Sequence, residues 1–134
     1  MTAIAEGGGS KATAPEAKLT TMKEFMLLFR LPEQDPSKTS PKEWEALAKK
    51  WQDWVGGIVA QDKFVSNGKR LAREGKVLKP GGVITDGPFG DIREWLGSFC
   101  VVKAENLDDA TTLAHGCPAL DMGGSVEIRP IYEY

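Results

Sequence analysis

The spacing of apolar residues alternates along the chain between a period of two, typical of strands, and a period near 3.6, typical of helices. The segment Lys23–Arg30 has period two and predicts the first strand. Apolar residues occupy both of its faces, with Phe25, Leu27 and Phe29 on one face and Met26 and Leu28 on the other. A strand with two apolar faces is expected to be covered on both sides.

A long helix is predicted next. The stretch Ser40-Pro41-Lys42-Glu43 has an N-cap serine, proline at the first helical position and glutamate three residues after the cap, which is a capping box. Apolar residues then recur at helical spacing: Trp44, Leu47, Ala48, Trp51, Val55, Ile58 and Val59. The helix is expected to end between Val55 and Lys63, because Gly56-Gly57 weakens it by about 1 kcal/mol per glycine. Trp54 lies off this row, which leaves open whether it contacts a partner, lines a cavity or is partly exposed.

The remaining predicted elements are shorter. Asn67-Gly68 predicts a turn, and Asp86-Gly87-Pro88-Phe89 predicts a tight corner after an apolar strand. Asn106 is expected to cap a second helix, which Pro118 stops. The further strands expected are Lys69–Ala72, Lys76–Leu78, Val83–Thr85, Trp95–Ala104 and Ser125–Ile131.

This order of elements predicts an α+β fold. It is the ferredoxin-like βαββαβ arrangement, with an antiparallel sheet and both helices on one face. Met26 and Leu28 then lie on the face that the helices leave bare. Because a bare apolar face suits a monomer in water poorly, we expect a symmetric homodimer. Two copies would pack sheet against sheet as a dimeric α+β barrel, with a cavity between the sheets.

Composition limits the number of domains and the kinds of partner. The chain has 134 residues, of which 41% are hydrophobic and 27% charged, and this fits one domain over residues 21–134. Residues 1–20 include Gly7-Gly8-Gly9-Ser10, show no periodicity and are expected to form a disordered tail. A net charge of −2 and a pI near 5.5 give no reason to expect nucleic acid. No apolar run approaches the roughly 20 residues of a membrane helix, so we expect no membrane contact and a cytoplasmic location.

Residues that commonly hold metals are few. Cys100 and Cys117 lack CxxC spacing, and His115 is the single histidine. The usual zinc ligand sets are therefore absent from the sequence. No phosphate-binding loop is found either, since Gly7-Gly8-Gly9 follows no strand and precedes no GK[ST]. We expect no metal and no cofactor, and we expect both cysteines to be reduced, packed thiols.

Asp86 is the candidate catalytic residue. At a strand end beside a cavity, its carboxylate would lose hydration and act as a general acid or base. The structural alternative is an Asx turn, in which Asp86 accepts backbone N–H groups within the corner. Phe89, at the end of the corner, is a candidate ligand-contacting residue, with core filling as its alternative.

Four charged residues are candidates for ligand binding: Arg93, Glu94, Glu127 and Arg129. Glu127 and Arg129 alternate with apolar residues of the last strand and are expected to face the cavity between the sheets. Charges there need partners, because unpaired burial is costly. The partners would be each other, Arg93 or Glu94, or the carboxylate or phosphate of a ligand, which suits the planar guanidinium. A structural ion-pair network that holds the dimer is the alternative.

Several short motifs, in this order, resemble the YCII-related family and specifically its DGPF branch. They are Phe25-Met26-Leu27-Leu28, Thr85-Asp86-Gly87-Pro88-Phe89, Leu96-Gly97-Ser98-Phe99, Leu107-Asp108-Asp109-Ala110, Cys117-Pro118 and Gly124-Ser125-Val126-Glu127-Ile128-Arg129-Pro130-Ile131. The resemblance covers about Met22 to Tyr134 and implies a dimeric α+β barrel of bacterial origin. It also implies an association with alternative sigma factors. Some members are suspected enzymes with a histidine–aspartate pair, whereas the histidine of this chain is on the second predicted helix.

Two functions follow from these residues. One is a small dimeric protein that binds a small polar ligand or a regulatory partner, such as part of a sigma-factor system, in the cavity between the sheets. The other is an acid–base enzyme that acts on a small polar molecule with Asp86 as the general acid or base, helped by Glu127 and Arg129. The orientation of Asp86, toward a cavity or into its own turn, separates the two.

Overall fold

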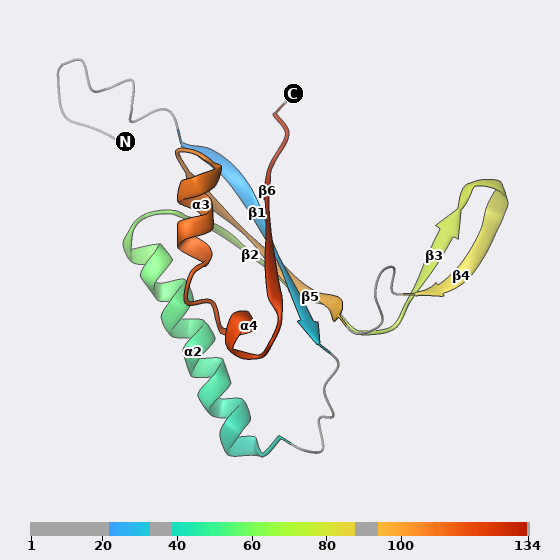
Figure 1. Cartoon of the computed structure of the whole chain (residues 1–134), viewed down its shortest axis with the longest axis horizontal. Coiled ribbons are helices and arrows are strands. Elements are labelled where there is room, and N and C mark those ends of the chain that lie inside the picture. The colour runs from blue at the N-terminus through green and yellow to red at the C-terminus, as the bar shows by residue number, and fades with distance from the viewer. Residues whose placement is uncertain (1–21, 33–38, 88–93, 134) are drawn as a thin grey trace.

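The computed structural model describes residues 22–32, 39–87 and 94–133. Its elements follow the predicted order, with a long helix after the first strand and a strand near each end (Figure 1). In chain order they are β1 (Lys23–Pro32), α2 (Pro41–Ala60), β2 (Phe64–Arg70), β3 (Gly75–Lys79), the 3-10 turn η3 (Pro80–Gly82), β4 (Val83–Gly87), β5 (Glu94–Ala104), α3 (Leu107–Ala114), α4 (Pro118–Asp121) and β6 (Ser125–Pro130).

Four of these strands form the main sheet, in the order β2-β5-β1-β6, with every neighbouring pair antiparallel. The helical connections join strands that are not neighbours, which is the βαββαβ arrangement of the ferredoxin-like fold. The helices α2, α3 and α4 lie together on one face of the sheet, and no helix of the described residues covers the other (Figure 1). The predicted α+β class, the antiparallel sheet and the one-sided helix layer are confirmed.

The core lies between the sheet and the helices. Phe25, Leu27 and Phe29 of β1 are at most 2% exposed. They form the face of β1 that the alternation of its residues assigns to the interior. Their neighbours on β5 and under the helices are also buried: Cys100, Val102, Ala104, Ile58, Ala110, Leu113, Ala114, Cys117 and Ala119. The central position of β1 in the sheet therefore follows from its apolar content.

The start of α2 forms as its sequence predicts. The Ser40 hydroxyl accepts the Glu43 backbone N–H at 3.1 Å, and the Glu43 carboxylate accepts the Ser40 backbone N–H at 2.8 Å. The helix continues through Gly56-Gly57 to Ala60, within the predicted limits. Trp51, Trp54 and Ile58 pack against the core, which offsets the low helix propensity of the two glycines.

Three local predictions are wrong. The strand expected over Lys69–Ala72 forms earlier, as β2, so Leu71 and Ala72 lie outside it. Asn67-Gly68 does not form a turn but lies inside β2, at an irregularity in the register with β5. A Cβ at Gly68 would collide with the backbone of Phe99, so glycine is required there by the close approach of the two strands. Pro118 does not stop the second helix, which ends at Ala114. Instead it begins the short helix α4, a position where its missing N–H costs nothing.

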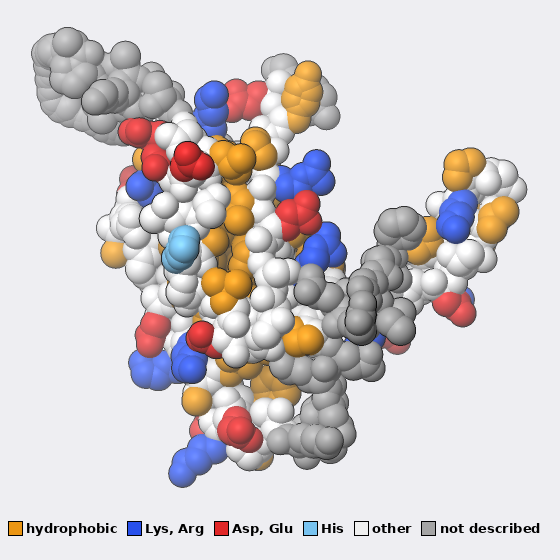
Figure 2. Space-filling view, in the orientation of Figure 1, with side chains coloured by type: hydrophobic (Ala, Val, Ile, Leu, Met, Phe, Trp, Pro, Cys, Tyr) orange, Lys and Arg blue, Asp and Glu red, His pale blue; other side chains and the backbone are white. Residues whose placement is uncertain are grey.

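The strands β3 and β4 pair only with each other and form a hairpin that projects away from the main sheet (Figure 1). Hydrophobic side chains are visible on this hairpin in the space-filling view (Figure 2), and Leu78, Val83 and Ile84 are 71%, 53% and 62% exposed. An isolated two-stranded hairpin is marginally stable in water. The hairpin therefore gains little stability from the rest of the chain.

Candidate ligand site on the outer face of the sheet

The face of the main sheet opposite the helices is here called the outer face. It carries side chains of the three adjacent strands β5, β1 and β6, because residues directly opposite one another in a sheet point to the same side. Met26 lies between Val101 and Arg129, and Leu28 lies between Phe99 and Glu127. The apolar members of this face are half-buried within the single chain, in contrast to the buried inner face. An apolar band on β1 and β5 thus borders a charged row on β6.

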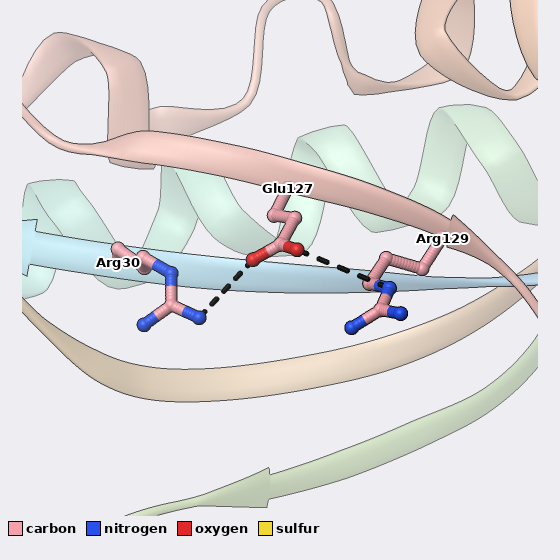
Figure 3. Close-up of polar contacts among 3 residues, drawn as sticks. All are labelled: Arg30, Glu127 and Arg129. Carbon is pink, nitrogen blue, oxygen red and sulfur yellow. Dashed lines mark hydrogen bonds and ion pairs between the residues drawn. The ribbon is translucent and has the colours of Figure 1, made fainter. Parts of the chain in front are cut away.

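Arg30, Glu127 and Arg129 form an ion-pair cluster along this charged row (Figure 3). Arg30 Nη2 donates to Glu127 Oε1 at 3.1 Å, and Arg129 Nε lies 3.9 Å from Glu127 Oε2. The side chains of Arg30 and Glu127 are 35% and 42% exposed, whereas that of Arg129 is 68% exposed. Glu127 therefore has a hydrogen bond from Arg30 and a longer ion pair with Arg129.

The net charge of the cluster is positive, which favours the binding of another anion. Two guanidinium groups surround one carboxylate, so the three side chains carry one net positive charge. Each guanidinium has five N–H donors in a planar fork that matches a carboxylate or phosphate. The longer Arg129 contact leaves much of its fork facing solvent. The cluster can hold a small anion, and it can equally act as a structural ion pair.

Arg30 is the member of this cluster that the sequence prediction missed. The prediction placed Glu127 and Arg129 on one face and named each other, Arg93 or Glu94, or a ligand as their partners, and the structure brings the two together. Arg30 continues the Met26, Leu28 alternation of β1, so the same period of two would have assigned it to this face. The prediction ended the first strand at that residue and did not extend the pattern.

Asp86 lies on β4 in the projecting hairpin, away from the outer-face cluster. Its Oδ1 accepts from Lys76 Nζ at 2.8 Å across the hairpin, and its side chain is 90% exposed. The loss of hydration that a general acid or base would need is not provided by these surroundings. In the single chain, Asp86 acts as the partner of a surface lysine.

The side chains of three other candidate residues lie outside the described part of the chain. Phe89 and Arg93 lie outside the described residues. Glu94 is the first residue of β5, and its side chain is likewise outside the described part. Their contribution to a site stays a prediction.

The two cysteines are free and buried. Burial raises the pKa of the Cys100 thiol to about 12 and that of Cys117 to about 11. Both are therefore protonated at neutral pH and are poor nucleophiles. Within residues 22–32, 39–87 and 94–133, no group of three or more His, Cys, Asp and Glu side chains is arranged to hold a metal ion. Among the helices of the same residues, none combines the length and apolar character needed to span a membrane.

The antiparallel sheet in the order β2-β5-β1-β6, with its helices on one face, defines this chain as a ferredoxin-like α+β domain. A family model, the YCII-related domain, matches residues 26–134, and the chain belongs to the YCII-related family. No curated protein matches the chain. The family predicted from the short motifs is confirmed, and its DGPF branch stays a prediction.

Proposed function

We propose that this chain works as a homodimeric binding protein for a small anionic molecule, with the outer faces of two sheets packed against each other. The observation that carries the proposal is the apolar band of Met26, Leu28, Phe99 and Val101 beside a cationic cluster, on a face that no helix of the described residues covers. A continuous apolar face of this kind marks an interaction site.

A second copy of the chain fits this face, because a two-fold axis would place the apolar band of one subunit against the same band of the other. The charged row on β6 lies beside that band, so it would border the interface. Dimerisation would partly remove Arg30 and Arg129 from water. Their electrostatic attraction for an anion would then be stronger, because the interaction energy of two charges rises as the local dielectric constant falls. The ligand class that suits two planar forks is a small carboxylate or phosphate.

The dimer is tested by Val101→Glu, which places a charge in the centre of the apolar band on both copies. We expect sedimentation equilibrium to give a dimer for the unchanged chain and a folded monomer for this variant. The matched control is Val59→Glu, at a position 55% exposed on the helix side, which should leave the dimer intact. A monomeric unchanged chain at 100 μM would refute this arrangement.

Anion binding is tested separately by thermal unfolding with phosphate and with citrate. A ligand at a hundredfold excess over its dissociation constant stabilises the folded chain by about 2.7 kcal/mol. Arg129→Gln should reduce the rise in midpoint, while Lys49→Gln, which removes a distant exposed cation of α2, should not. Equal rises in both variants would show that the cluster does not bind the anion, whatever the oligomeric state.

The surroundings of Asp86 do not support an acid–base enzyme that uses this residue. Its carboxylate is exposed and ion-paired to Lys76 on the hairpin, and it does not line the cavity that lies between α2, β2 and β5.

A further inference from the structure

A cavity of about 500 Å³ lies on the helix side of the sheet, between α2 and the strands β2 and β5. This is within the range of about 300–1,000 Å³ that small-molecule sites occupy. Its apolar lining comes from Phe29, Trp51, Trp54, Val55, Val59, Phe99 and Cys100. The cavity is on the opposite side of the sheet from the outer-face cluster, and Phe99 belongs both to its lining and to the apolar band of the proposed interface.

The aromatic wall of this cavity is built in advance of any ligand. Phe29, Trp51 and Trp54 meet edge to face in all three pairs, with ring centroids 5.2, 5.7 and 5.9 Å apart. The Trp54 indole N–H also donates to the carbonyl oxygen of Leu113 at 3.1 Å, which fixes that ring to α3. Rings held in this way lose little freedom when a flat apolar molecule packs on them.

Gly56 keeps the cavity open on its helix side. It lines the cavity, and a Cβ built on it would meet no heavy atom within 4 Å. Packing therefore does not require glycine, although glycine within a helix costs about 1 kcal/mol relative to alanine. A side chain at this position would project into the space that the cavity offers. Gly57, the next residue of the same helix, has equally open surroundings but is not part of the lining.

The polar part of the lining is cationic. Lys69 and Arg70 of β2 contribute to it, together with the neutral side chains of Gln52, Asn67 and Ser98. Neither cation takes part in the ion pairs formed among the described residues. An apolar aromatic wall beside two cations matches a ligand with a flat body and one anionic group.

We infer that the cavity between α2, β2 and β5 binds a small aromatic carboxylate. The rings of the ligand pack on Trp51 and Trp54, which buried Phe29 supports from the core, and its carboxylate faces Lys69 and Arg70. The open position at Gly56 determines how large the ring system can be.

The test is calorimetric titration of the full chain with 2-naphthoate and with its neutral amide, 2-naphthamide. Gly56→Leu should weaken 2-naphthoate binding about tenfold or more, equivalent to about 1.4 kcal/mol. Gly57→Leu, the matched control, should change it less than twofold. Gly56→Ala and Gly57→Ala repeat the comparison with alanine, which favours the helix, and only the first should weaken binding.

Replacing both cations, Lys69→Gln with Arg70→Gln, should weaken 2-naphthoate binding about tenfold, as expected for hydrogen bonds to a charged group. The same double variant should leave 2-naphthamide binding within twofold of the unchanged chain. Equal losses in the Gly56 and Gly57 variants would overturn the location of the site. Equal losses for the acid and the amide would overturn the role of the cations. An absence of heat with millimolar 2-naphthoate at two well-separated temperatures would overturn the ligand class, because apolar burial changes the heat capacity and cannot be without heat at both.

Discussion

Leu27 and Leu28 are neighbours on the central strand β1 and point to opposite faces of the sheet. Leu27 is 0% exposed, within the core, and Leu28 is half-buried on the outer face. Leu27→Ala removes three carbon atoms at about 0.8 kcal/mol each and leaves a cavity, which together cost about 3.5 kcal/mol. Leu28→Ala removes the same atoms from a site already partly in water, and it should cost about 1 kcal/mol in a single chain.

Urea unfolding followed by far-UV circular dichroism measures both costs. With a slope of about 1.75 kcal/mol per molar urea, Leu27→Ala should lower the midpoint by about 2 M and Leu28→Ala by about 0.6 M. The comparison is made at 1 μM and at 100 μM protein. If two copies cover the outer face, the cost of Leu28→Ala should rise at the higher concentration, because the partner buries this leucine. A cost below about 1.5 kcal/mol for Leu27→Ala would refute the assignment of the inner face.

Four further predictions concern α2, β2 and the cysteines. Ser40→Ala should destabilise the chain by about 1 kcal/mol in urea unfolding, because the capping box loses its hydroxyl acceptor. Hydrogen bonds from Ser40, first from its backbone N–H and then from its hydroxyl, lower the pKa of Glu43 below 4.5. A carboxylate with a lowered pKa in the folded chain adds stability above pH 4.5, and this stability is lost as the pH falls through the folded pKa. Glu43→Gln should therefore remove that part of the pH dependence of unfolding, measured from pH 6 to 2. Gly68→Ala should cost about 1–3 kcal/mol or more, because its Cβ meets the Phe99 backbone, while Gly75→Ala, with open surroundings, should cost far less. With Ellman's reagent at pH 8, native Cys100 and Cys117 should react slowly and the urea-unfolded thiols at once; fast native reaction would contradict their burial.

The sequence by itself determined the elements whose causes are local. The alternation of β1, the capping box before α2 and the Asn106 cap, whose side chain accepts the Asp109 backbone N–H at 2.8 Å, can each be recognised within a few residues. The two apolar faces of β1 also predict a second apolar side of the sheet, beyond the one that the helices cover. These patterns were sufficient to predict the ferredoxin-like order of strands and helices.

Only the tertiary structure decided which distant residues meet. Arg30 and Glu127 are 97 positions apart and contact each other because β1 pairs with β6 in one particular register. Asn67-Gly68 has the composition of a turn, but pairing with β5 holds it inside a strand. The cavity beside α2 depends on a helix and two strands packing together with no side chain at Gly56 to fill the space. Register and packing are sums of many long-range contacts, and no local pattern of residues encodes them.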